Sequence, residues 1–164
     1  MKKERIMFDQ LINNYEDFVV LADKQMTNPF YTVAFTIYAL NMYPKNKEES
    51  LKMLTYLCGP RGLSEMDKQF IRDRFMDKDY VPRSYFEGAL PSNDYTPSIP
   101  YTIVVHDSPY SYQNEGYMTL FVQSGGADSL RQVQVRQAKD GKWYLWEQML
   151  LADIRKPESE NPWV

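Results

Sequence analysis

The sequence is poor in the residues that most enzymes use at metal and nucleophilic sites. It has one histidine, His106, and one cysteine, Cys58, among 164 residues. A structural zinc site usually takes four Cys or His ligands, so these two cannot build one. A lone cysteine forms no internal disulfide, which indicates a reducing compartment, and we expect a bacterial cytoplasm. The sequence predicts neither a metal site nor a cofactor.

Long apolar runs and an excess of positive charge are missing as well. The most apolar window, 29–43, is too short to span a bilayer. The first residues read MKKERIMFDQ, where charged residues interrupt any apolar signal core. The formal net charge is −3 with both signs interleaved, whereas nucleic-acid binding normally needs a basic stripe. We therefore expect a cytoplasmic protein with no nucleic-acid partner and no membrane partner.

Catalytic signatures are equally scarce. The chain has no P-loop, no dinucleotide glycine fingerprint and no twelve-residue calcium loop. Gly125-Gly126 could form an anion-binding nest, but a tight connection between strands is the simpler interpretation. Cys58 directly precedes a helix-ending glycine, a position that does not activate a thiol, so we expect it to be inert and buried. No catalytic residue is nominated.

What the first half does contain is helical periodicity. Apolar residues at three- and four-residue steps predict an amphipathic helix over 4–25. Thr27-Asn28-Pro29 is a start signal for a second helix that ends before Pro44, and its nearly all-apolar surface predicts burial at the centre of the fold. Capping residues predict two further helices, one opened by Asn46 with Glu49 and one by Ser64 with Asp67, the latter reaching about Met76.

The second half changes to a period of two. Strand candidates are 101–107, 117–123, 130–138 and 143–151. The sequence thus predicts an α+β fold with about four N-terminal helices packed on a C-terminal twisted antiparallel sheet. We expect a single domain over 1–164, divided into a mostly helical half (1–78), a proline-rich loop with at most one short strand (79–100), the sheet (101–154) and a tail (155–164). A loop this long is often functional.

Asp140-Gly141 is a type I′ hairpin signal that would fix the register of the last two strands. A two-residue loop there pairs Ala138 with Trp143, Arg136 with Leu145 and Gln134 with Glu147. Two faces follow from this register: a core wall of Val133, Val135, Tyr144 and Trp146, and a mixed face of Gln132, Gln134, Arg136, Trp143, Leu145, Glu147 and Met149.

A wholly solvated face should not alternate Trp, Leu and Met with polar residues. The mixed face is therefore a helix-covered wall, a ligand pocket or a subunit interface. In the first case Arg136 and Glu147, which lie diagonally across the two strands, could neutralise each other without any function.

We expect a non-enzymatic binding or protein-interaction module whose partner is a small molecule or a protein. Trp143 and Met149 would supply apolar contact, and Gln134, Arg136 and Glu147 would orient a polar group. A rival hypothesis is a small cavity enzyme of the lyase, isomerase or hydrolase type. His106 or Glu147 would then be the general base, and Tyr101 or Arg136 would stabilise negative charge. A third is a homodimer through the sheet face or the Trp163 tail.

Four stretches carry a resemblance to a known family: TPSIPYTIVV, YMTLFVQSGGADSLRQVQVR, GKWYLWEQMLLADIRKP and NPWV. Over about 30–164 the chain resembles an uncharacterised bacterial family of domains of unknown function, common in anaerobic gut Firmicutes, which implies no activity. Helices followed by a curved antiparallel sheet are also similar to the cystatin-like cone of the nuclear-transport-factor-2 superfamily. Such folds usually place a strand among the helices, and the sequence shows no clear strand before residue 80.

Overall fold

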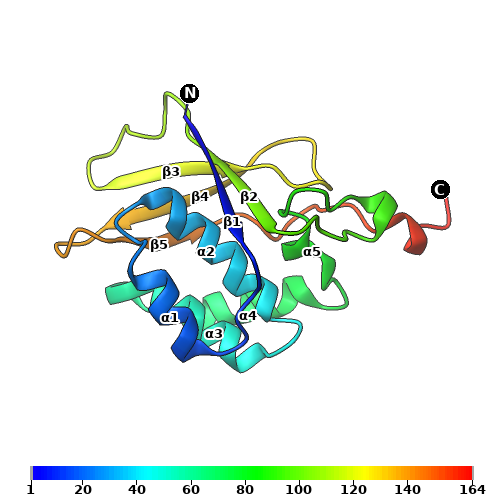
Figure 1. Cartoon of the computed structure of the whole chain (residues 1–164), viewed down its shortest axis with the longest axis horizontal. Coiled ribbons are helices and arrows are strands. Elements are labelled where there is room, and N and C mark those ends of the chain that lie inside the picture. Colours follow the sequence, from blue (N-terminus) through cyan, green and yellow to red (C-terminus); the bar gives the residue numbers. More distant parts are fainter. Residues whose placement is uncertain (1, 164) are drawn as a thin grey trace.

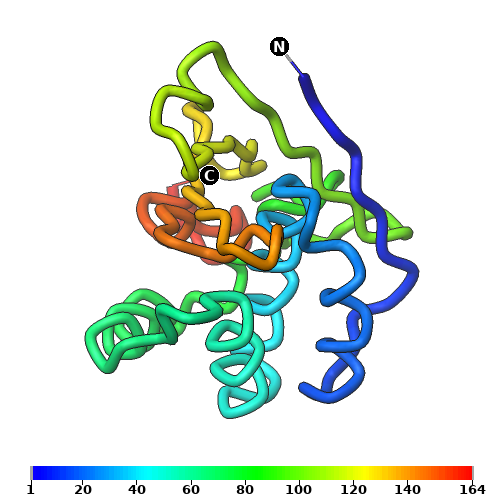
Figure 2. Tube along the Cα trace, turned by 90° about the vertical axis from the view of Figure 1, so that its left-hand side faces the viewer, coloured from blue at the N-terminus to red at the C-terminus, as the bar shows by residue number. Residues whose placement is uncertain are grey.

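The computed structural model describes residues 2–163, and this part of the chain forms five helices and one five-stranded antiparallel sheet, an α+β fold (Figure 1). The elements run in the order β1 (Lys3–Phe8), α1 (Tyr15–Asp23), α2 (Pro29–Met42), α3 (Lys47–Cys58), α4 (Glu65–Phe75), α5 (Tyr80–Arg83), β2 (Tyr101–His106), β3 (Tyr117–Val122), β4 (Arg131–Gln137) and β5 (Trp143–Gln148). Strands are neighbours in chain order, β1-β2-β3-β4-β5. The helices lie on one side of the sheet, as the view turned by 90° also shows (Figure 2). The face toward the helices is called the inner face below, and the opposite one the outer face.

The first segment is not one helix, so the prediction of a helix over 4–25 is wrong for its first half, 4–14. Residues 3–8 form β1, which pairs along its whole length with β2, and Ile6 lies opposite Ile103. Within β1 the side chains of Ile6 and Phe8 are buried and their neighbours are exposed, which is a period of two. The chain restarts as α1 only after Asn14, whose side chain accepts the N–H of Asp17. Pairing with a strand a hundred residues away outweighs the local helical spacing.

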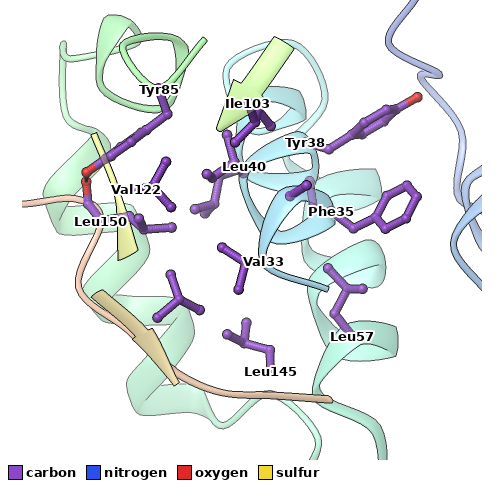
Figure 3. Close-up of a cluster of buried hydrophobic side chains, with 14 of the residues drawn as sticks. Val33, Phe35, Tyr38, Leu40, Leu57, Tyr85, Ile103, Val122, Leu145 and Leu150 are labelled. Atoms are coloured by element: carbon purple, nitrogen blue, oxygen red, sulfur yellow. Dashed lines mark hydrogen bonds between the residues drawn. The ribbon is translucent and has the colours of Figure 1, made fainter. Parts of the chain in front are cut away.

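α2 is the centre of the fold, as its composition predicts. The side chain of Asn28 accepts the N–H of Phe30, and Pro29 occupies the first turn. Every residue from Thr32 to Met42 is buried, and α2 contacts all five strands. Figure 3 shows its side chains meeting those of the strands and of α3, with Val33, Leu40 and Leu145 among them. No helix within residues 2–163 is long and apolar enough to cross a membrane.

α3 and α4 begin at the predicted caps. Asn46 caps α3 through the N–H of Glu49, and Ser64 with Asp67 forms a reciprocal capping box at α4. Between the two helices, Gly59 ends α3 in a left-handed conformation with φ of 57°, which favours glycine. A Cβ on Gly59 would lie 2.4 Å from the ring of Tyr144, so the α3–α4 connection packs directly on β5.

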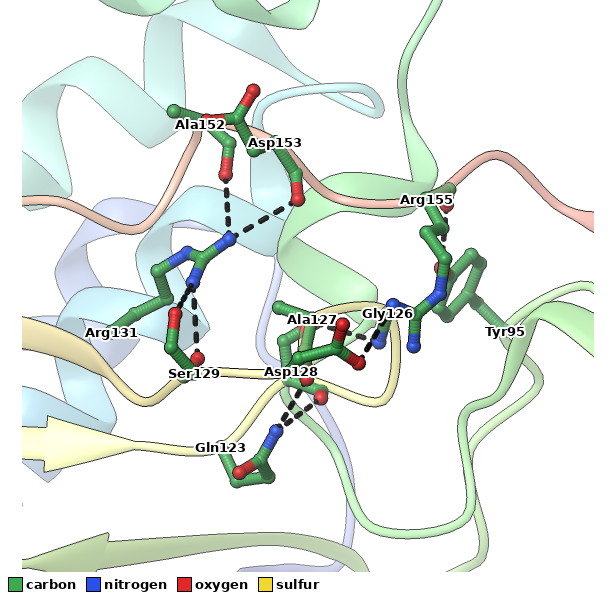
Figure 4. Close-up of polar contacts among 11 residues, drawn as sticks. Tyr95, Gln123, Gly126, Ala127, Asp128, Ser129, Arg131, Ala152, Asp153 and Arg155 are labelled. Atoms are coloured by element: carbon green, nitrogen blue, oxygen red, sulfur yellow. Dashed lines mark hydrogen bonds and ion pairs between the residues drawn. The ribbon is translucent and has the colours of Figure 1, made fainter.

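The 79–100 segment is ordered and contains the short helix α5 and a 3-10 turn at Pro91–Asn93, with no strand among its residues. The predicted tail packs on it, because the hydroxyl of Tyr95 donates to the Arg155 carbonyl at 2.5 Å. Figure 4 shows two further contacts of the tail region: Arg131, the first residue of β4, donates to the Asp153 carbonyl (3.1 Å), and Arg155 pairs with Asp128 of the β3–β4 connection (3.0 Å). The loop, this connection and the tail therefore form one end of the molecule.

Gly125-Gly126 lies in that end as a connection between strands. The N–H of Gly125 donates to the Ser84 carbonyl and that of Gly126 to the Ser124 hydroxyl, so both amides are occupied within the chain. A Cβ on Gly125 would sit 2.0 Å from the Ala89 carbonyl oxygen. Close backbone approach, not anion binding, accounts for these two glycines.

Candidate functional site

The β4–β5 hairpin departs from its predicted register near the turn. Gln137 pairs with Trp143 and Arg136 with Tyr144, one position away from the expected pairs. The N–H of Ala138 donates to the Lys142 carbonyl (2.9 Å), which leaves three residues in the loop. A type I′ turn needs positive φ at both central residues, but only Gly141 has it, at 86°. Gly141 therefore takes the left-handed position of a three-residue loop, and the prediction of a two-residue loop is wrong.

A β-bulge restores the predicted register farther from the turn. Val135 lies opposite Leu145, yet Gln134, which precedes Val135 in β4, lies opposite Glu147 as predicted. Trp146 is therefore the extra residue in β5. A bulge places two consecutive residues opposite one, which turns Trp146 and Glu147 toward the same, outer face. Tyr144 is on that face too, opposite Arg136. The predicted core wall therefore keeps its two valines and loses Trp146, while Tyr144 still packs against the core from the strand edge, where its ring meets Gly59.

Trp143 and Leu145 move to the inner face in exchange. Leu145 is buried, and Trp143 is half-buried against the core. The backbone of Trp143 is held as well, because its N–H donates to Met26 (2.8 Å) and its carbonyl accepts from the Thr32 hydroxyl (2.8 Å). Trp143 therefore belongs to the packing of α2 on β5, and the prediction that it shares a face with Arg136 is wrong.

The outer face carries a stack of alternating rings and guanidinium groups, which we call the Trp146 cluster (Arg61, Tyr117, Arg136 and Trp146). The guanidinium of Arg136 lies 4.8 Å from the ring centre of Trp146 and 5.1 Å from that of Tyr117. The two rings meet edge-on at 5.8 Å, and Arg61 approaches Trp146 at 5.7 Å. Cation–π contacts and an edge-on ring pair hold these long side chains in place at the surface.

A cavity of about 390 Å³ opens between β5 and α4, and we call it the β5 cleft. Its size is within the range of small-molecule pockets. The lining residues are Leu40, Leu54, Cys58, Arg61, Leu63, Asp67, Phe70, Ile71, Leu145, Trp146, Glu147 and Gln148. On its other side Trp146 borders a more open hollow lined by Gln113, Asn114, Glu115, Tyr117 and Gln134. Trp146 is therefore the wall shared by two concave surfaces.

Two of the charged groups that line the cleft, Arg61 and Asp67, are partly exposed and satisfied within the chain. Arg61 pairs with Asp67 at 3.0 Å and donates to the Gly62 carbonyl at the same distance. Burial opposes ionisation of Asp67, but hydrogen bonds from Ser64 and the charge of Arg61 outweigh it and lower the pKa of Asp67. Burial raises the pKa of Cys58 to about 11, which supports the expectation of an unreactive thiol. Within residues 2–163 no three His, Cys, Asp or Glu side chains are arranged to hold a metal ion.

Four of the predicted site residues do lie together on the outer side. Gln134 pairs with Glu147, and Arg136 lies two residues along β4. Met149 is exposed and directly follows β5, and its N–H donates to the Gln132 carbonyl (3.0 Å). The expected cross-strand ion pair is not formed, and no ion pair to Glu147 is found among the described residues.

His106 and Tyr101 lie elsewhere. β3 and β4 separate His106 from Glu147, and a strand spacing of about 4.8 Å places them roughly 14 Å apart. The carboxylate of Asp107 accepts from the N–H of Lys2 (2.6 Å) and the hydroxyl of Tyr112 (2.5 Å), so it does not act as a dyad with His106.

Burial, with a smaller contribution from the charge of Lys3, lowers the pKa of His106, while Asp107 opposes the shift. Tyr101 packs on Phe86 at 5.1 Å, at the opposite end of β2 from His106. The groups of the cavity-enzyme hypothesis are therefore not brought to one cavity.

Sequence reasoning missed Arg61, Tyr117 and Trp146. For Trp146 the only signal was its spacing from Trp143. In a regular strand two residues three positions apart lie on opposite faces of the sheet. The bulge that keeps Trp146 beside Glu147 has no marker such as glycine in the sequence of β5.

Comparison with known proteins adds a family and no activity. The family model described as a domain of unknown function, DUF6935, matches residues 10–158. No match was found among curated proteins or among solved structures.

Proposed function

The chain belongs to the DUF6935 family, and we propose that it is a non-enzymatic binding module that uses the Trp146 cluster and the β5 cleft. One observation carries the proposal: the bulge turns Trp146 outward, where it walls both the cleft and the neighbouring hollow. A tryptophan in that position offers a large apolar surface to a ligand in either space.

The chemistry of the surroundings supports a ligand with an apolar or aromatic part and a polar part. The cleft is lined by aliphatic and aromatic side chains together with polar ones, and Arg61 among the polar ones is already paired. At its mouth Glu147 is exposed, and Gln134 lies opposite it. In this proposal Trp146 provides the contact area, while Gln134, Arg136 and Glu147 orient the polar part, with Met149 at the rim.

We also propose a domain organisation, a fold type and a compartment for the chain. We infer a single domain, because one continuous hydrophobic core joins helices and sheet. The helices on one side of an antiparallel sheet support a cystatin-like cone, while β1 precedes the helices and does not lie among them (Figure 1). The free thiol of Cys58 supports a reducing compartment, as in a cytoplasm. A homodimer through the outer face is the competing use of the same residues, and light scattering of the full chain tests it.

The proposal is tested by titrating ¹⁵N-labelled full chain with indole, benzoate and benzamidine and following the indole N–H signals. We expect at least one fragment to shift the Trp146 signal, and Trp146→Ala to weaken its binding at least tenfold. The matched control is Trp163→Ala, because Trp163 is 92% exposed in the tail. The proposal fails if no fragment binds at millimolar concentration or if Trp146→Ala binds as well as the parent.

A further inference from the structure

We propose that the ligand of the β5 cleft is an extended peptide segment that adds to the free edge of β5 as a sixth strand. This rests on the proposed function and names the class of its partner. Peptide recognition by strand addition takes affinity from main-chain hydrogen bonds and specificity from alternate side chains. The structure supplies an open edge, apolar walls and an unpaired charge at one place.

The open edge follows from the way β5 is held at its start. Both backbone groups of Trp143 point away from β4, since they bind Met26 and Thr32. Backbone groups of residues i and i+2 in a strand point to the same side, so the N–H and carbonyl of Leu145 also point away from β4. The bulge then inserts one residue, which makes Gln148 the next to face this edge.

Leu145 and Gln148 both line the β5 cleft, so this stretch of the free edge of β5 runs beside the cavity. Among the described residues no hydrogen bond outside the sheet satisfies the backbone of Leu145. Buried backbone groups are nearly always paired in proteins, and an incoming main chain supplies both a donor and an acceptor. The window from Leu145 to Gln148 matches a peptide of about four residues.

The other edge of the sheet lacks these features. β1 carries exposed Lys3 and Arg5, and charged side chains of this kind protect an edge from pairing. Its Glu4 accepts from the side-chain amide of Asn28 (3.1 Å), which ties the strand to the start of α2. Of the two outer strands in the described part of the sheet, β5 is the one that lies beside the cleft.

Side chains around the cleft define the sequence that fits. A peptide residue opposite Leu145 would point to the inner side, among Leu63 and Ile71. Its neighbour would point to the outer side, where Glu147 has no ion-pair partner among the described residues. An alternation of apolar and basic residues therefore complements the site.

The size of the cleft favours a short segment of chain at this edge. A volume of about 390 Å³ admits a short segment of chain, while α4 stands on the other side of the opening. On α4, Phe70 lines the cleft and is 43% exposed, so it offers an apolar contact to a peptide that leaves the cleft.

The test uses the ¹⁵N-labelled full chain and the probe acetyl-Val-Lys-Val-Lys-Val-Lys-amide. We expect the largest amide shifts at Leu145 and Gln148. A probe with N-methylated valines, which loses main-chain donors, should bind roughly tenfold more weakly. A Val-Glu version should also bind more weakly, and Glu147→Gln should weaken the lysine probe by about two- to fivefold. Glu158→Gln, in the exposed tail, is the matched control with no expected effect.

The outcomes separate this inference from the proposed function. Binding of aromatic fragments to Trp146 without binding of the peptide overturns strand addition and leaves the binding module standing. Equal binding of the methylated and unmethylated probes, or shifts confined to residues outside the cleft, also overturns it. Absence of both fragment and peptide binding removes the two proposals together.

Discussion

Successive residues of β4 serve the two faces of the sheet in different ways. Val133 and Val135 are fully buried against α2, while Gln134 and Arg136 face outward toward Glu147 and the ring of Trp146. The inner side chains are enclosed on all sides, whereas the outer ones depend on a few contacts near water. Stability is therefore concentrated on the inner face and the candidate binding chemistry on the outer face, so substitutions should affect the two properties separately.

The largest effect should come from the inner face of β3. Leu120 is fully buried opposite Val133, so Leu120→Ala leaves a cavity and should lower the free energy of unfolding by about 2–5 kcal/mol. Its neighbour Thr119 faces outward, and Thr119→Ala should cost less than about 1 kcal/mol. Urea unfolding measures both, and equal losses would contradict the division between the faces.

Gly126→Ala tests how far the close packing extends beyond the strands. A Cβ there would lie 2.1 Å from the Tyr95 hydroxyl and 2.9 Å from Ile154, so the variant should lose about 1–3 kcal/mol of unfolding free energy. Adding Tyr95→Phe removes the closest atom. In a double-mutant cycle the two changes together should cost less than the sum of each alone, and strict additivity would refute the clash.

The outer face should show a smaller, pairwise effect. Arg136→Ala and Trp146→Leu each remove the cation–π contact, and their double-mutant cycle should give a coupling of about 0.5–1 kcal/mol in unfolding free energy. Arg136→Ala with Trp163→Ala is the control cycle, and it should show no coupling. If the control cycle gave a coupling as large as the one with Trp146, the coupling could not come from the contact between Arg136 and Trp146.

The smallest effect concerns pH. Since the folded-state pKa of His106 is lowered, its neutral form is favoured by folding, and this contribution to stability is lost as pH falls through that pKa. As the only histidine, His106 gives one imidazole signal, whose NMR titration midpoint should lie below 6.5. His106→Gln should flatten the stability profile between about pH 5 and 7. A midpoint above 6.5 would reverse the sign.

Much of the fold was predictable because its signals are local. Asn28 with Pro29 marks the start of α2, and Ser64 with Asp67 marks that of α4, since capping involves residues within one turn. The four later strands were found from their period of two. β1 was missed because its pattern over six residues also fits a helix, and its partner β2 lies far along the chain.

The candidate site was predicted in part. Gln134, Arg136 and Glu147 do share the outer face, but Trp143 was assigned to the wrong side and Trp146 took its place. The error came from the loop: Asp-Gly fits both a two-residue and a three-residue connection, and the choice between them shifts every side chain near the turn to the other face.

By itself the sequence determined the α+β composition, the buried helix at the centre and the lack of a metal or nucleophilic motif, because these depend on residue types and short-range spacing. Only the tertiary structure decided the sheet position of the first segment, the bulge at Trp146 and the cavity beside β5. These depend on pairing and packing between segments far apart in the chain, whose energies no local pattern encodes.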